Sequence, residues 1–279
     1  LAFFLRTGYV VDAASAQQVG INLPRVRPDV FDHISIPLPP LAEQARIVAK
    51  LERIEQARRA QKKAIQQTQA LLKAALAQVF DTKDGLSNER EVARLGDVTL
   101  KTEFSDPRKS PDEPFRYVDI ASVDNETGQI LEARELLGRD APSRARKRIQ
   151  AGDVIVATTR PYLRGVADVP SPLDGQICST GFCVLRSNGS TNQRFLYFFA
   201  RSDFFIRQLS ARMRGASYPA VTDRDVFESD IVFPPLPVQH RVVAKLDRIQ
   251  RALKLQRDAL GNMDALMQSA LHSAFHGKL

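Results

Sequence analysis

The sequence repeats itself with a shift of 195 residues, and this repeat constrains the fold more than any other feature of the chain. Residues 39–54 read PPLAEQARIVAKLERI, and residues 234–249 read PPLPVQHRVVAKLDRI. The match runs without a gap from residues 39–80 to residues 234–275, where nineteen of forty-two positions are identical. Two unrelated charged helices would not keep one register over that length, so we infer two copies of one structural unit.

The same shift relates the residues that precede each copy. The matched pairs are Leu1 with Leu196, Phe3 with Phe198, Phe4 with Phe199, Gly20 with Gly215, and Pro24 with Pro219. Residues 1–38 are therefore expected to be the tail of a domain that is cut on its N-terminal side. The predicted order is this tail, a first long helix over residues 39–85, a complete domain over residues 86–235, and a second long helix over residues 236–279.

Both copies of the repeated segment have the pattern of long amphipathic helices. Residues 41–80 contain no glycine or proline, and apolar residues recur there at spacings of three and four. In the second copy, Val242, Leu246, Ile249 and Leu253 follow a nearly strict heptad spacing. Forty helical residues span about 60 Å, which exceeds the width of a small domain. We therefore expect the two apolar stripes to pack against each other; the alternative is that each helix covers only its own domain.

The segment between the helices has a different pattern. Residues 117–122, 153–158 and 177–185 are expected to form strands, because each is rich in β-formers and is bounded by glycine, proline or aspartate. Residues 192–214 are expected to form an amphipathic helix. The predicted fold class is α+β: a domain of mixed α/β character joined to two long helices.

Composition narrows the class of protein. The net charge of +8 and the pI of about 9.7 favour a polyanionic partner. No apolar run approaches the roughly 18 residues that span a bilayer, so no membrane association is expected. The two cysteines, Cys178 and Cys183, are too few for a disulfide framework and are interpreted as small buried apolar residues. A cytoplasmic protein is expected.

The proline-led segment PLAEQARIVAKL, its repetition, and the C-terminal residues AFHGKL resemble Type I restriction-modification specificity subunits. Leu95-Gly96-Asp97-Val98 and residues 151–155 add weaker support. The resemblance implies a subunit with two target-recognition domains, each reading one half of a split DNA site, held apart by two long helices that form an antiparallel coiled coil. It also implies modification subunits that bring S-adenosylmethionine, and restriction subunits in a larger complex.

This chain departs from that family pattern in one important respect. Its first target-recognition domain is reduced to residues 1–38, so we expect it to read one half of a bipartite site while the helices scaffold the modification subunits. The expected partners are double-stranded DNA, modification subunits and restriction subunits.

Sequence motifs for catalysis are absent. The chain has no Asn/Asp-Pro-Pro-aromatic motif for a flipped adenine, no glycine-rich loop for a methyl donor and no G-x-x-x-x-G-K-[ST] loop. We therefore expect a non-catalytic subunit with no catalytic residues, no cofactor of its own and no metal site.

DNA contact is predicted at three clusters, although residues 90–235 carry 21 basic and 20 acidic residues and are nearly neutral as a whole. Arginine suits DNA because its planar fork binds either a phosphate or the two major-groove acceptors of guanine, and hydroxyl groups add further contacts. The predicted DNA-binding residues are Arg144, Arg146, Lys147 and Arg148 in the first cluster, Thr159, Arg160, Tyr162 and Arg164 in the second, and Arg212, Arg214, Ser217 and Tyr218 in the third.

Two other functions remain open at the level of sequence. The chain could be the DNA-recognition region of a single-chain restriction-methyltransferase, although such an enzyme needs only one helical arm and the repeat disfavours it. It could also be a coiled-coil scaffold that binds proteins. Specific, salt-sensitive DNA binding is expected of a specificity subunit and of a single-chain restriction-methyltransferase, but not of a protein-binding scaffold.

Overall fold

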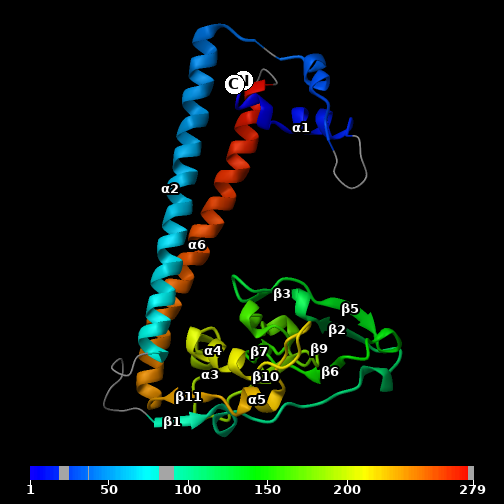
Figure 1. Cartoon of the computed structure of the whole chain (residues 1–279), viewed down its shortest axis with the longest axis vertical. Helices are drawn as coiled ribbons and strands as arrows, with labels where there is room; N and C mark the ends of the chain where they lie inside the picture. The colour runs from blue at the N-terminus through cyan, green and yellow to red at the C-terminus, as the bar shows by residue number, and fades with distance from the viewer. Residues whose placement is uncertain (19–24, 37, 82–90, 276–279) are drawn as a thin grey trace. The chain divides into compact units, whose positions relative to one another are not determined.

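The computed structural model describes residues 1–18, 25–36, 38–81 and 91–275 (Figure 1). Of the sequence features discussed above, Gly20, Pro24, the predicted boundary between residues 85 and 86, and residues 276–279 lie outside this described part. The chain divides into two compact units. Unit 1 consists of Leu1–Ala70 and Gln250–Leu279, and unit 2 consists of Leu71–Ile249. The four-part division expected from the sequence groups the residues differently and stays a prediction.

The described residues form six α-helices and eleven strands, together with short 3₁₀ turns. The helices are α1 (Gly8–Ser15), α2 (Leu41–Phe80), α3 (Gln193–Ala200), α4 (Asp203–Arg212), α5 (Asp223–Phe227) and α6 (Leu236–Phe275). The strands are β1 (Glu91–Arg94), β2 (Pro114–Val118), β3 (Val123–Asp124), β4 (Gln129–Ile130), β5 (Arg134–Leu137), β6 (Ala145–Arg148), β7 (Val154–Ala157), β8 (Val166–Asp168), β9 (Ile177–Ser179), β10 (Phe182–Leu185) and β11 (Asp230–Phe233).

The two predicted long helices are confirmed as α2 and α6, each of 40 residues. In unit 1 they pack side by side and antiparallel (Figure 1), because Ile47 and Leu51 of α2 share an apolar cluster with Met267 and Leu271 of α6. At the middle of the pair, the Gln61 side-chain amide donates a 2.8 Å hydrogen bond to the backbone carbonyl of Gln256. These two glutamines are 195 residues apart, so equivalent positions of the repeat meet at this point.

In unit 2 the helices α2 and α6 form a second apolar cluster, equivalent to the one in unit 1. There Leu72 and Leu76 near the end of α2 share a cluster with Val242 and Leu246 near the start of α6. Each of these four positions is the 195-residue counterpart of one in unit 1. The helices thus use the same apolar positions twice, once in each unit.

The residues next to the helices repeat as well, down to single contacts. In unit 1, the centre of the Phe4 ring lies 5.0 Å from the centre of the Phe275 ring and 6.3 Å from that of the Tyr9 ring. In unit 2, the counterpart Phe199 lies 5.5 Å from Phe80 and 6.4 Å from Phe204. Residues 1–15 therefore reproduce, in three dimensions, the junction between α3 and α4.

Hydrogen bonds repeat in the same way. The Thr7 hydroxyl donates to the Phe4 carbonyl at 2.7 Å, as Ser202 does to Phe199. The Gln44 side chain donates to the carbonyl of Pro39 at 2.8 Å, and its counterpart Gln239 donates to Pro234 at the same distance.

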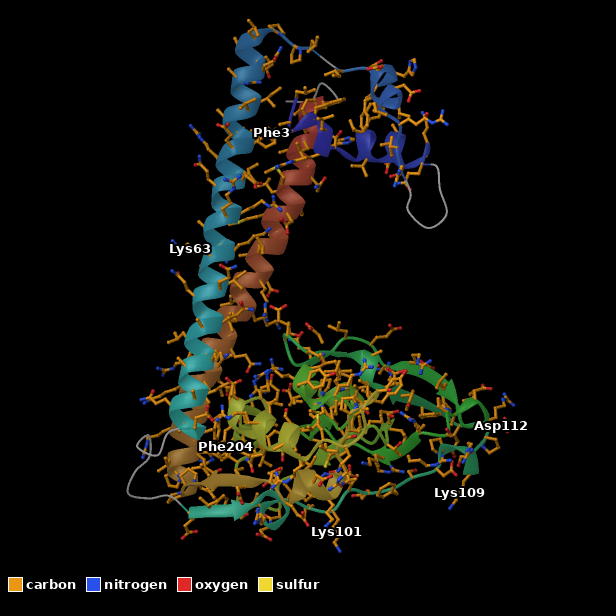
Figure 2. All side chains as sticks on the ribbon, in the orientation of Figure 1. Phe3, Lys63, Lys101, Lys109, Asp112 and Phe204 are labelled. Carbon is orange, nitrogen blue, oxygen red and sulfur yellow. The ribbon has the colours of Figure 1, made fainter. Side chains whose placement is uncertain are left out.

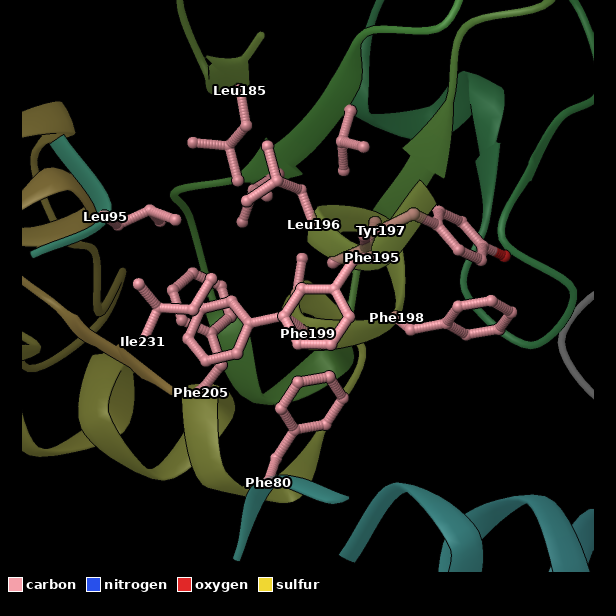
Figure 3. Packing of buried hydrophobic residues seen from close by; sticks show 14 of the residues in the cluster. Phe80, Leu95, Leu185, Phe195, Leu196, Tyr197, Phe198, Phe199, Phe205 and Ile231 are labelled. Atoms are coloured by element: carbon pink, nitrogen blue, oxygen red, sulfur yellow. The ribbon is translucent and has the colours of Figure 1, made fainter. Parts of the chain in front are cut away.

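The α+β character expected for the segment between the helices is confirmed in unit 2. A three-stranded antiparallel sheet has the order β10-β7-β8, and a four-stranded sheet has the order β5-β2-β9-β6 with β2 and β9 parallel. Strand β7 alternates in the expected way: Val154 and Val156 face the cluster that contains α3, whereas Ile155 and Ala157 face a second cluster. The phenylalanines of α3 fill the first cluster together with Leu95, Leu185 and Ile231 (Figure 3).

Three of the expected elements have different bounds from those predicted. The helix expected over residues 192–214 is two helices, because the Ser202 hydroxyl accepts a hydrogen bond from the Phe205 amide and starts α4. The strand expected over residues 177–185 is two strands around Gly181, where a Cβ atom would lie 2.7 Å from Ile120. The strand over residues 117–122 ends at Val118, because Asp119 caps a 3₁₀ turn.

The two cysteines are buried and unpaired, as the sequence predicted, but they lie on separate strands and not on one. Burial raises the pKa of the Cys178 thiol to about 12 and that of Cys183 well above its usual value. Among the described residues, no helix combines the length and apolar character that a membrane span requires.

Phe80 is expected to be essential for the stability of unit 2. Its buried ring lies 5.2 Å from Phe195 and 5.5 Å from Phe199. Phe80→Ala should lower the free energy of unfolding by about 3–5 kcal/mol, because it leaves a cavity among rigid rings. Leu255→Ala, at a helix position that is 68% exposed, should change it by less than about 0.5 kcal/mol. Guanidinium denaturation followed by circular dichroism measures both, and equal midpoints would show that Phe80 does not anchor α2 to α3.

Candidate nucleic-acid interface

Two of the three predicted clusters come together on unit 2. Residues 158–165, which we call the Arg160 loop, lie beside residues 212–220, which we call the Tyr218 loop. The Arg160 amide donates a 2.8 Å hydrogen bond to the Pro219 carbonyl, and the Val221 amide donates to Thr158 at 2.9 Å. Thr159 and Ala220 form a β-bridge between the loops. These backbone contacts join residues that are about sixty positions apart in the sequence.

The Arg160 loop has an unusual backbone. Arg160 and Arg164 both adopt the left-handed conformation, with φ of 48° and 59°. Between them a single 3₁₀ turn buries Pro161 and leaves Tyr162 and Leu163 exposed to 46% and 49%. The loop therefore presents an aromatic and an aliphatic side chain to solvent.

The Tyr218 loop closes on itself. Arg214 and Ala220 exchange two backbone hydrogen bonds of 2.9 Å, and Gly215 turns the chain with φ of 96°, a value that favours glycine. Ser217 and Tyr218 lie at its exposed end, and Tyr218 is 73% exposed.

The remaining predicted cluster, which contains Arg144, is connected to the Arg160 loop through one turn of the chain. The Thr158 amide and hydroxyl both donate to the Gly181 carbonyl at 2.9 Å, and the neighbouring Thr180 amide donates to the Arg144 carbonyl at 2.8 Å. Arg144 directly precedes β6. Arg144 and the Arg160 loop thus both contact the turn between β9 and β10, and the Tyr218 loop is joined to them through the Arg160 loop.

Within the Arg144–Arg148 cluster, strand alternation separates the basic side chains. Arg144 and Arg148 are exposed. Arg146 donates to Asp106 at 2.5 Å. Lys147 is only 2% exposed, and its ammonium donates to the Asp223 carboxylate at 2.5 Å and to the Phe182 carbonyl at 2.6 Å. Side chains along a strand point alternately inward and outward, and Lys147 occupies an inward-facing position. The prediction that Lys147 contacts DNA does not fit this burial.

Several predicted arginines in the other clusters have partners inside the protein. Arg164 forms an ion pair with Asp203; burial disfavours that carboxylate, but the hydrogen bond and charge of Arg164 outweigh it and lower the pKa of Asp203. Arg214 pairs with Asp225 at 3.2 Å, and hydrogen bonds from the Thr222 amide and hydroxyl lower the pKa of Asp225. Arg212 donates to the backbone carbonyl of Gln208 in α4 and to that of Glu228, directly after α5.

One exposed aromatic residue near these clusters was not predicted. Phe104 is 68% exposed and forms a β-bridge with Lys147 beside strand β6. Its only sequence signal is a single phenylalanine in a polar stretch, which does not distinguish it from other loop residues. Among the residues described, no group of three or more histidine, cysteine or acidic side chains has the arrangement of a metal site.

Comparisons with known proteins agree on one family. The family described as the Type I restriction modification DNA specificity domain matches residues 1–68 and 89–260. The MjaVIII specificity subunit of a Type I restriction enzyme from Methanocaldococcus jannaschii is 22% identical over 95% of this chain and 66% of its own length.

Two solved structures share higher identity over a shorter range. The HsdS subunit from Thermoanaerobacter tengcongensis is 49% identical, with a TM-score of 0.55 over 65% of this chain and 48% of that chain. A chain from a structure of the assembly and conformational transition of the type I R-M system is 50% identical, with a TM-score of 0.56 over 66% of this chain and 49% of that one. The chain thus spans about half the length of these solved relatives.

Lys147 is expected to contribute to stability, in contrast to its neighbour Arg148. Lys147→Met should lower the free energy of unfolding by about 2–3 kcal/mol, because it leaves Asp223 and the Phe182 carbonyl without their cation. Arg148→Met removes the same charge from the surface and should change stability by less than about 0.5 kcal/mol. Thermal unfolding of the two variants gives the comparison. Equal effects would mean that Lys147 is not buried as described.

Proposed function

The chain belongs to the family of Type I restriction modification DNA specificity domains, and from this premise we propose that it recognises a specific DNA sequence through the surface of unit 2 where the Arg160 loop, the Tyr218 loop and Arg144 meet. The observation that carries the proposal is this convergence. Three segments were chosen from the sequence for their DNA-binding residue types. Hydrogen bonds join the Arg160 loop and Arg144 to the turn between β9 and β10, and join the Tyr218 loop to the Arg160 loop.

The local charge of this surface supports contact with DNA better than the overall charge does. Residues 90–235 are nearly neutral, but several acidic groups near the clusters are already paired with Arg146, Lys147 and Arg164. These three cations are left out of the proposed contact set. Among the described residues, Arg144, Arg148 and Arg160 form no ion pair with an acidic side chain, and they give the surface its positive charge.

The remaining predicted residues divide into two proposed roles. Arg144 and Arg148 are exposed at the edge strand β6 and suit phosphates, which fix the register of a protein on the duplex without reading its sequence. Arg212 and Arg214 lie at the start of the Tyr218 loop and suit phosphates as well; Arg214 pairs with Asp225, but its side chain is 71% exposed and remains accessible. Thr159, Arg160, Tyr162, Ser217 and Tyr218 lie on the two joined loops, where hydroxyl groups and an arginine fork suit base edges.

The wider function follows from the family. We propose a DNA-recognition subunit of a Type I restriction-modification complex that reads one half of a bipartite site and catalyses no reaction itself. The long helices α2 and α6 would scaffold modification subunits, and restriction subunits would join the larger assembly. A chain 50% identical to this one occurs in a structure concerned with assembly of such a system, which supports these partners.

The phosphate contacts are tested by the salt dependence of binding. Replacing Arg144 and Arg148 together with glutamine should weaken binding to all duplexes and reduce the slope of log K against log salt by about 1.8, since each lost phosphate contact removes about 0.9. Fluorescence anisotropy at several salt concentrations gives the slope.

A matched control separates this local effect from net charge. Lys62 and Lys63 are exposed on α2, and Lys63 points away from α6 (Figure 2). Replacing both with glutamine also removes two charges but should leave the slope within about 0.5 of the wild type, because no phosphate contact is lost. If the two double variants change the slope equally, the Arg144–Arg148 surface is not where DNA binds.

A further inference from the structure

Among the predicted DNA-contacting arginines, Arg160 differs in how its guanidinium is held. Arg146, Arg164 and Arg214 each form an ion pair within the protein. The guanidinium of Arg160 lies instead 5.2 Å from the centre of the exposed Tyr218 ring, and no ion pair of Arg160 is found among the described residues. Its guanidinium is therefore held over the ring by a cation–π contact and has no acidic partner.

The backbone on both sides of Tyr218 is held by hydrogen bonds within and between the two loops. Arg214 and Ala220 close the Tyr218 loop with two hydrogen bonds, and the Arg160 amide donates to Pro219, the residue next to Tyr218. Arg160 and Tyr218 thus come from distant segments but are fixed against each other by three backbone contacts of 2.8–2.9 Å. A cation held over an aromatic face loses little further freedom when it binds a ligand.

The backbone at Arg160 gives a second, independent observation. A φ of 48° and ψ of 57° is the left-handed conformation, which favours glycine because a Cβ atom crowds the following carbonyl. A residue with a long side chain in that conformation is strained, and such strain concentrates at functional positions. The turn at Arg160 would form at least as well with glycine. The backbone therefore does not account for an arginine at this position, which points to a function of its side chain.

We propose that Arg160 reads a guanine in the major groove, and that Tyr218 is the positioning residue that orients it; this rests on the proposed function of DNA recognition. A guanidinium stacked on a ring presents one planar edge, with two N–H donors in a fixed geometry. Guanine is the base that offers two acceptors, O6 and N7, at the matching spacing. A phosphate would not require this orientation, since a flexible exposed cation such as Arg144 meets that need.

Arg160→Gly tests the proposal without damaging the fold, because glycine accepts the left-handed backbone. Selection of bound duplexes from random DNA should give the wild-type sequence preference except at one position, where a guanine preference is lost. The melting temperature should be unchanged or higher. Arg164→Gly is the matched control: it removes another left-handed arginine, one that pairs with Asp203, and should keep the guanine preference.

A modified base tests whether the contact is made to N7 of guanine. Replacing the affected guanine with 7-deazaguanine, which lacks the N7 acceptor, should weaken binding of the wild-type chain by about five- to hundredfold. It should have little effect on Arg160→Gly, which has already lost the contact. Tyr218→Phe keeps the ring and should retain the preference, whereas Tyr218→Ala should reduce it at the same position.

The outcomes distinguish the two proposals. If the wild-type chain selects no sequence at all, the proposed function of DNA recognition is wrong, and the role of Arg160 is wrong with it. If the wild-type chain selects a sequence and Arg160→Gly selects the same one at every position, DNA recognition stands and the assignment of Arg160 is overturned. If Tyr218→Phe and Tyr218→Ala behave alike, Tyr218 does not position Arg160 through its ring.

Discussion

The Phe80 ring at the end of α2 packs among Phe195, Phe199 and the neighbouring apolar residues of unit 2, and the rest of that unit depends on this contact (Figure 3). It joins the long helix to α3, and α3 in turn covers the sheet from which the Arg160 loop emerges. The same contact recurs in unit 1, where Phe275 at the end of α6 meets Phe4. The same aromatic contact therefore attaches a domain to the end of a long helix in both units, at positions related by the 195-residue repeat.

Ion pairing decides which cations of the candidate interface keep their charge free for a ligand. Asp106, Asp203 and Asp223 each pair with one cation and cancel its charge, so the arginines without an acidic partner are the ones proposed to meet DNA. Pairing also separates arginines that look alike in the sequence. Arg164 is tied to Asp203, while Arg160, four residues earlier and in the same backbone conformation, lies on the Tyr218 ring.

The features that the sequence predicted well are periodic or repeated. The long helices and their pairing follow from heptad spacing, and the α+β character of unit 2 follows from short apolar runs between turn residues. The bounds of α3, α4, β9 and β10 were missed because single residues decide them, as Ser202 does by capping and Gly181 by close packing. The burial of Lys147 was missed because four basic residues in a row suggest a surface, although alternation along a strand must turn some of them inward. The pairing of the Arg160 and Tyr218 loops joins distant residues, which no local pattern reveals.

Hydrogen–deuterium exchange of the chain with and without a duplex selected from random DNA tests the location of recognition most directly, since it reports on every backbone amide without any substitution. The expected result is slower exchange with DNA at residues 158–165, at residues 212–220 and next to Arg144, and unchanged exchange in the buried strand β7. Protection confined to α2 and α6, with the two loops exchanging as in the free chain, would contradict recognition through the surface of unit 2.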